Sequence, residues 1–158
     1  MDFAASIATA EAGGDRAPAE TSSLLIRHHK TGAAHVSIGL PTGGHVLHLA
    51  AATCLFNDLH TAAAQRGLRL GPVSVRADGG FDDTMTASTG IRVSVEISGE
   101  AAADELRTLV LETFDVSTVA CVLRRGTSVE IAEIVTRTTT ATPPPTTAAR
   151  PLGGSTVG

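Results

Sequence analysis

Apolar and polar residues alternate in several stretches of this chain, and this alternation is typical of half-buried β-strands. The clearest stretch is Ile91–Ile97, in which four apolar side chains alternate with Arg92, Ser94 and Glu96. Because one face of such a strand is buried and the other is solvated, the pattern favours antiparallel sheets. Four further strands are predicted from alternation or from short apolar runs: Ser23–Lys30, Ala34–Leu40, Val73–Ala77 and Thr127–Val135.

Three other stretches have the pattern of helices. His45–Arg66 is long and rich in Ala and Leu, and Gly67 is a suitable C-terminal stop. Ala101–Phe114 has a single apolar stripe, as an amphipathic helix does, and Ser117–Arg124 is a short helix with Ser117 as its N-cap. The predicted order is β-β-α-β-β-α-α-β, which is an α+β fold rather than a regular α/β alternation.

The stretch Gly44–Gly67 is apolar nearly all round, so the helix needs cover on every side. One small sheet covers only one side. A second copy of the chain is the simplest source of the remaining cover, and we therefore expect a homodimer with these helices near its centre.

The two ends of the chain differ from the middle. Residues 1–20 are rich in Ala and Gly and are expected to form a loose arm, with a short helix at Asp2–Ala12. Residues 136–158 are rich in Thr, Pro and Gly and are predicted to be a disordered tail. A single domain at 21–135 remains between them.

Composition excludes several classes of protein. The net charge is −4 and no basic patch stands out, which argues against nucleic acid as the main partner. No apolar run is long enough to span a membrane, and the N-terminus does not have the pattern of a signal peptide. Two cysteines neither build a disulfide framework nor fit a zinc motif, so a cytoplasmic protein with reduced thiols is expected.

Cys54 lies in the middle of the long helix, and Asn57 and Asp58 lie one turn away from it. A carboxylate disfavours the thiolate form of a neighbouring cysteine unless a cation compensates. A reactive Cys54 therefore requires an arginine from another segment or subunit, and the candidates are Arg27, Arg124 and Arg125. From these residues alone, a buried and unreactive cysteine is the favoured interpretation.

Histidines offer a second kind of site. His45 and His48 have i, i+3 spacing at the start of the long helix, and either could act as a general acid or base in an interface pocket. A metal would need a third ligand from elsewhere, so no metal site and no cofactor are expected.

Three stretches, HLAAATCLFNDLHTAAAQRGLRLGPVSVRADGGFD (48–82), GIRVSVEISGEA (90–101) and DELRTLVLETFDVSTVACVLRRGTSVEI (104–131), resemble the OsmC/Ohr family. This family comprises osmotically induced protein C and the organic hydroperoxide resistance proteins. The resemblance covers about Thr21 to Val135 and rests on the order of elements, on Cys54 in the central helix, and on the Val-Leu-Arg-Arg-Gly segment before the last strand.

The resemblance implies an intertwined α+β homodimer with antiparallel sheets, a long buried central helix and two active sites at the interface. It also implies a peroxidatic thiolate that attacks a hydroperoxide and becomes a sulfenic acid. A second cysteine, in a Cys-Pro-Val segment, then closes a disulfide that dithiols reduce.

Cys54 matches the first family cysteine, but the second does not carry over. Ser117-Thr118-Val119 stands where Cys-Pro-Val belongs, and Cys121 lies four residues further on. The family also often has a Pro-Glu-Glu segment before the central helix, whose glutamate organises the active-site arginine. Here the segment reads Gly43-Gly44-His45, without the acid.

Two functions from different classes follow. In the first, the chain is a thiol-dependent peroxidase in which Cys54 is the nucleophile and Cys121 or an external thiol or dithiol resolves it. In the second, the fold has been recruited for a non-redox small-molecule activity, such as a biosynthetic enzyme that uses His45 and His48; a ligand-binding protein is a weaker alternative. The candidate catalytic residues are Cys54, Cys121, His45, His48, Asp58 and Arg27.

Overall fold

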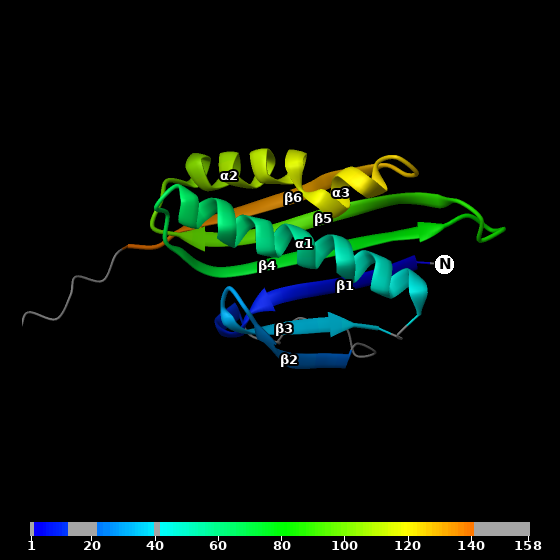
Figure 1. Cartoon of the computed structure of the whole chain (residues 1–158), viewed down its shortest axis with the longest axis horizontal. Coiled ribbons are helices and arrows are strands. Elements are labelled where there is room, and N and C mark those ends of the chain that lie inside the picture. Colours follow the sequence, from blue (N-terminus) through cyan, green and yellow to red (C-terminus); the bar gives the residue numbers. More distant parts are fainter. Residues whose placement is uncertain (1, 13–21, 40–41, 141–158) are drawn as a thin grey trace, which may run out of the picture.

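The structure is a computed structural model that describes residues 2–12, 22–39 and 42–140 (Figure 1). The strands are β1 (Asp2–Thr9), β2 (Ser22–His28), β3 (Gly32–Ile38), β4 (Leu70–Phe81), β5 (Ser88–Gly99) and β6 (Val129–Thr138). The helices are α1 (Gly43–Gln65), α2 (Ala103–Val116) and α3 (Thr118–Leu123), with a 3-10 turn, η1 (Ala10–Ala12), after β1. The predicted α+β class is confirmed.

All six strands belong to one sheet with the order β2-β3-β1-β4-β5-β6. Neighbouring strands from β2 through β5 pair antiparallel, as the alternating pattern predicted. The prediction is wrong for β6, which pairs parallel with β5. Helices α2 and α3 lie between these two strands in the chain and carry it back along the sheet, and such a crossover is what a parallel pair requires.

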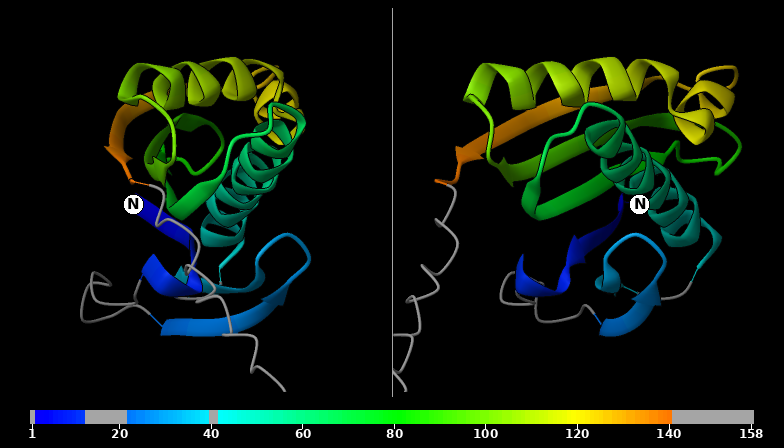
Figure 2. Two further views of the ribbon diagram at one scale, coloured as in Figure 1. Left: turned by 90° about the vertical axis from the view of Figure 1, so that its left-hand side faces the viewer. Right: turned by 60° about the vertical axis from the view of Figure 1, so that its left-hand side comes forward.

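The long helix α1 packs across β1 and β4, and α2 lies beside it near β5 and β6. Figure 2 shows both helices on the same side of the sheet. The core forms where the apolar face of α1 meets the inward face of the central strands. Its largest fully buried side chains include Leu55, Phe56, Leu59, Val75, Val93 and Leu106.

The first strand corrects the expectation of a loose arm with a helix at Asp2–Ala12. β1 lies inside the sheet between β3 and β4, with Phe3, Ala5 and Ile7 buried against the core. The period-two pattern is present in the sequence, but the alanines on both faces hide it, since alanine is compatible with burial and with exposure. Long-range pairing with β3 and β4 decides the conformation.

Other boundaries move as well. β4 and β5 both extend beyond the predicted strands Val73–Ala77 and Ile91–Ile97, so that only residues 82–87 connect them. β6 continues past Val135 to Thr138, whose hydroxyl donates to the carbonyl oxygen of Ala101 at 3.0 Å. The predicted tail therefore begins later than expected, and residues 141–158 lie outside the described part of the chain.

Candidate functional site

Cys54 lies on the side of α1 that contacts α3, and its side chain is half-buried. The thiol takes part in two hydrogen bonds. Its Sγ donates to Oδ2 of Asp58, one turn further along α1, at 3.5 Å. It also accepts a hydrogen bond from Oγ of Ser117, at 3.5 Å. The sulfur thus lies between a carboxylate that accepts its proton and a hydroxyl that donates to it.

Ser117 is the residue that links α2 to α3. It holds the N-cap position of α3, as predicted, but its side chain makes no cap hydrogen bond. The hydroxyl points to Cys54 instead, and the residue is only 1% exposed. The position was predicted correctly, whereas the partner of the hydroxyl depends on the packing of α3 against α1.

The arginines proposed as partners of Cys54 lie elsewhere. Arg124 donates to the carbonyl oxygens of Phe114, Asp115 and Val129, and its guanidinium stacks over the Phe114 ring at 4.3 Å. These contacts secure the C-terminal end of α2. The thiol near its guanidinium is that of Cys121, at 3.9 Å.

Arg27 is on β2, next to His28, whose ring contacts α1. Successive side chains of a strand point to opposite faces, so Arg27 faces away from the α1 of its own chain. Arg125 is exposed. Among the residues that the structure describes, no guanidinium forms a hydrogen bond or ion pair with Cys54 or Asp58.

A histidine cluster that was not predicted as a site lies on another side of α1. His28 is nearly buried, and its Nε2 lies 2.6 Å from Oδ1 of Asn57. Phe56 has an edge-to-face contact with His28 and with His60. Burial, aided by the nearby His28 and Lys30, lowers the pKa of His60, and its Nε2 is buried without a hydrogen-bond partner in the described structure.

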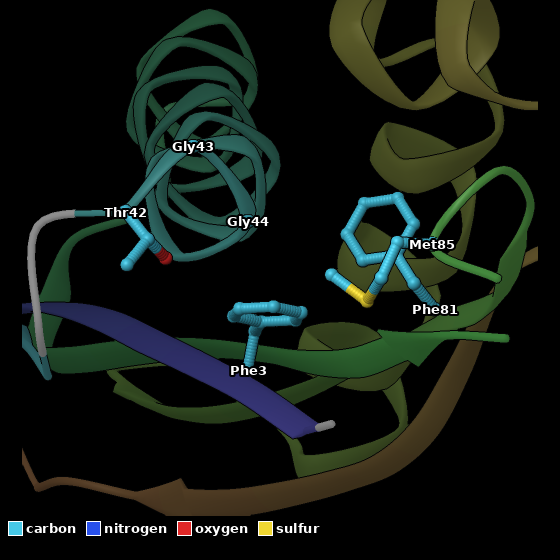
Figure 3. A pocket seen from close by; sticks show the side chains of 6 residues that line it. All are labelled: Phe3, Thr42, Gly43, Gly44, Phe81 and Met85. Atoms are coloured by element: carbon cyan, nitrogen blue, oxygen red, sulfur yellow. The ribbon is translucent and has the colours of Figure 1, made fainter. Parts of the chain in front are cut away.

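A pocket lies at the N-terminal end of α1, the end that carries the predicted pair His45 and His48, although neither histidine is among its lining residues (Figure 3). The pocket has a volume of about 360 Å³ and is lined by Phe3, Thr42, Gly43, Gly44, Phe81 and Met85. The Phe3 ring contacts the rings of both His45 and His48. Nδ1 of His48 donates to the Gly44 carbonyl oxygen at 2.7 Å, while its buried Nε2 has no partner within the described residues.

The spacing along α1 separates this pocket from the thiol. Gly44 and Cys54 are ten residues apart, which corresponds to roughly 15 Å along a helix axis. Cys54 with Asp58, and His45 with His48, are therefore two distinct places on the helix rather than one combined site.

Comparison with known proteins identifies the family. The model of the OsmC family, described as OsmC-like protein, matches residues 35–132, which is more than half of the chain. The chain belongs to the OsmC-like family. A search of curated proteins finds no match.

Two solved structures with TM-scores above 0.5 share the fold of this chain. An OsmC-like protein from Mycoplasma pneumoniae superposes with a TM-score of 0.52 at 10% identity, over 73% of this chain and 96% of that one. A hypothetical protein from Aquifex aeolicus VF5 gives 0.55 at 11% identity, over 75% and 97%. An organic hydroperoxide resistance protein OsmC from Legionella pneumophila, also described as a predicted redox protein, gives 0.48 at 14%, over 76% and 99%.

The OsmC/Ohr resemblance predicts that Ser117 stands in the place of the second family cysteine. In the structure, the hydroxyl of Ser117 contacts the sulfur of Cys54. Cys121 is exposed, and its Sγ donates to the carbonyl oxygen of Asp115 at 3.3 Å. Both cysteines of this OsmC-like chain are free thiols.

Two further properties bear on what the OsmC-like chain binds. The described residues contain no group of three or more His, Cys, Asp or Glu side chains arranged to hold a metal ion. Within the same residues, no helix is long and apolar enough to cross a membrane.

Proposed function

We propose that this OsmC-like protein reduces organic hydroperoxides through the thiol of Cys54. The observation that supports this function is the position of the thiol, which is half-buried and hydrogen-bonded to both Asp58 and Ser117. Family membership and the match of Cys54 to the first family cysteine support the choice of substrate class.

The proposed reaction uses the two neighbours of the sulfur in turn. Asp58 accepts the thiol proton as Sγ attacks the terminal oxygen of the hydroperoxide, and the O–O bond breaks. The leaving alkoxide takes up the proton and departs as an alcohol, while Cys54 becomes a sulfenic acid. The Ser117 hydroxyl donates to the sulfur and so stabilises negative charge there before attack.

Arg27 and Cys121 have different places in this proposal. Arg27 faces away from α1 within one chain, so it serves Cys54 only if it comes from a second copy. Active sites at the interface of a homodimer, which the family resemblance implies, would allow this. Cys121 is exposed and directed toward the end of α2, and we propose no step for it.

Replacing Cys54 tests the proposal directly. Wild-type protein with excess dithiothreitol should consume cumene hydroperoxide, and Cys54→Ser should reduce consumption to the rate of the reductant alone, because no other thiol contacts Asp58 and Ser117 in the described structure. Cys121→Ser is the matched control and should retain the wild-type rate. Wild-type protein that consumes no hydroperoxide, with Cys54 unoxidised by mass spectrometry, would show that the proposal is wrong.

The pocket at the start of α1 supports a second candidate function, a non-redox activity on a small molecule. Its lining is largely apolar, and Phe3 connects it to His45 and His48. The unpartnered Nε2 of His48 is the lone-pair nitrogen when Nδ1 carries the proton, which suits a general base. If hydroperoxide is not consumed, His48→Phe and His45→Phe become the variants to assay against candidate ligands of this pocket.

A further inference from the structure

Ser117 is a buried polar residue whose hydroxyl, within the described part of the chain, donates its one hydrogen bond to the sulfur of Cys54. A serine at a helix N-cap ordinarily turns its oxygen toward the backbone of the first turn. Here the cap hydrogen bond is absent, and the side chain spans the contact between α3 and α1 instead. The local structure therefore holds the Cβ of Ser117 in a position from which a γ-atom reaches the sulfur of Cys54.

We propose that Ser117 occupies the place of a resolving thiol, so that oxidised Cys54 remains a sulfenic acid until an external small-molecule thiol reduces it. This inference rests on the proposed function for the oxidation step, but its geometric part stands independently. The proposal names free thiols in solution as the class of reductant. It also attributes the lack of an internal disulfide to one side chain, that of Ser117.

The distance between the two side chains supports the geometric part of the inference, namely that a thiol at position 117 could reach the sulfur of Cys54. Sγ of Cys54 and Oγ of Ser117 are 3.5 Å apart, whereas a disulfide needs two sulfurs about 2 Å apart. A cysteine at 117 has a longer bond from Cβ to its γ-atom than serine has, and the remaining gap is within reach of rotamer changes in two side chains. A thiol at position 117 would thus be suitably placed to close onto Cys54.

Cys121 does not take over this role in one chain. It lies one turn further along α3, and its backbone N–H donates to the carbonyl oxygen of Ser117 at 2.9 Å. Its exposed thiol donates to the Asp115 carbonyl oxygen and lies 3.9 Å from the guanidinium of Arg124. These contacts direct the Cys121 thiol toward the end of α2, whereas the Cys54 thiol is hydrogen-bonded to Asp58 and Ser117.

The redox steps balance with two equivalents of thiol. A first thiol attacks the sulfenic sulfur of Cys54, a mixed disulfide forms, and the hydroxyl leaves as water. A second thiol attacks the mixed disulfide, releases the Cys54 thiol and departs as the oxidised disulfide. The two electrons that reduced the hydroperoxide are therefore supplied by the external thiols and not by a second cysteine of the protein.

The test compares Cys121→Ser with the double variant Ser117→Cys, Cys121→Ser. Each is treated with one equivalent of cumene hydroperoxide and then with dimedone, which traps sulfenic acid, or with 2-mercaptoethanol. Cys121→Ser should give a dimedone adduct, or a mixed disulfide with 2-mercaptoethanol, on Cys54. The double variant should give neither, and its mass should fall by two hydrogen atoms as both thiols disappear.

A second oxidant separates the inference from the proposed function. Diamide oxidises thiol pairs without a hydroperoxide, and it should close the disulfide between 54 and 117 in the double variant while leaving Cys121→Ser unlinked. If hydroperoxide oxidises neither protein, the proposed function is wrong. The diamide result alone then shows whether a thiol at position 117 can form a disulfide with Cys54.

Three results would overturn the inference. The first is a folded double variant, with circular dichroism like that of Cys121→Ser, that keeps two free thiols after both oxidants. The second is a disulfide between Cys54 and Cys121 in the oxidised wild type. The third is a disulfide that joins Cys54 of one chain to a cysteine of another chain. Ser117→Ala serves as the control for burial and should keep the fold. Because it removes the hydrogen bond to Sγ, it should form the dimedone adduct on Cys54 more slowly than Cys121→Ser, still without an internal disulfide.

Discussion

Single residues set how closely α1 approaches the sheet. A Cβ built on Gly44 would lie 2.6 Å from the ring of Phe3, so the glycine allows the β1 side chain to lie under the start of the helix. A Cβ on Gly79 would overlap the Gly90 carbonyl oxygen and lie 2.7 Å from Nε2 of His48. The first of these two atoms belongs to the backbone of the neighbouring strand and cannot move away alone.

We predict that Gly79→Ala lowers the free energy of unfolding by about 3 kcal/mol, because the added methyl group must displace the paired strand and the buried His48 ring. Chemical denaturation measures this change. Gly43→Ala is the matched control, since nothing lies within 4 Å of its Cβ, and it should be neutral or slightly stabilising. Equal effects of the two substitutions would contradict the prediction.

His60 should make stability depend on pH. Burial lowers the pKa of its imidazole in the folded state, so the unfolded chain binds the proton more readily. The stability that His60 contributes is therefore fully present above its ordinary pKa of 6.5 and is lost as the pH falls from there toward the lowered folded value.

The prediction is a loss of unfolding free energy between roughly pH 7 and pH 5 that is smaller in His60→Leu. Denaturant titrations at each pH measure both proteins. A slope with pH that is the same in the two proteins would show that the buried imidazole is not the cause.

At the scale of elements, β1 is the strand on which the sheet depends. It joins the β2–β3 hairpin to the β4–β5–β6 half of the sheet, because it pairs with β3 on one edge and with β4 on the other. Without β1, the sheet would be interrupted beneath α1, and the inward faces of β3 and β4 would lose their common neighbour.

We predict that removing residues 1–12 prevents stable folding. Burial of Phe3 and Ile7 alone is worth about 3–6 kcal/mol, which is comparable with the roughly 5–15 kcal/mol that stabilises a typical domain. Circular dichroism and thermal melting measure the effect.

Truncation after Thr140 is the matched control at the other end. It keeps β6 and the hydrogen bond from the Thr139 N–H to the Gly99 carbonyl oxygen. The removed segment is rich in Thr, Pro and Gly, a composition that does not form a packed core. The melting temperature should stay within a few degrees of the full-length value. A cooperative melt that survives loss of residues 1–12 would contradict the role given to β1.

At the scale of the whole molecule, the described residues of one chain leave apolar surface exposed. Leu24, Leu25 and Ile26 on the edge strand β2 are exposed, as is Val46 on α1. β2 lies at the end of the sheet, and no strand of the described residues pairs with its outer edge (Figure 1). A monomer gains nothing from this surface, whereas a second copy that covers it buries apolar area on both sides.

We predict that the protein is a homodimer, with a mass in solution near twice 16.1 kDa. Val46→Asp and Leu24→Asp should each shift the equilibrium toward the monomer, because a charge would have to be buried at the interface. Leu111→Asp is the control on α2, where an exposed leucine lies away from β2. Analytical ultracentrifugation measures all four proteins, and a wild-type monomer at micromolar concentration would contradict the prediction.

The sequence by itself determined what depends on local pattern. The regular spacing of apolar residues located α1, α2 and five of the strands, because alternation and helical spacing are properties of residues close together in the sequence. The family followed from ordered segments around Cys54, and the model match over 35–132 confirms it. The substitution at Ser117 was also visible, since it is a matter of residue type.

Tertiary structure alone decided which groups meet. β1 formed because distant strands pair with it on both edges, and the parallel β5–β6 pair formed because two helices return the chain across the sheet. The partners of Cys54 and His28 were settled by how α3 and β2 pack on α1, and those of Arg124 by how the end of α3 meets α2 and β6. Contacts between segments far apart in the chain leave no periodic pattern in the sequence. Here those contacts place the hydroxyl of Ser117 against the thiol of Cys54, and no guanidinium of the described residues bonds to that thiol.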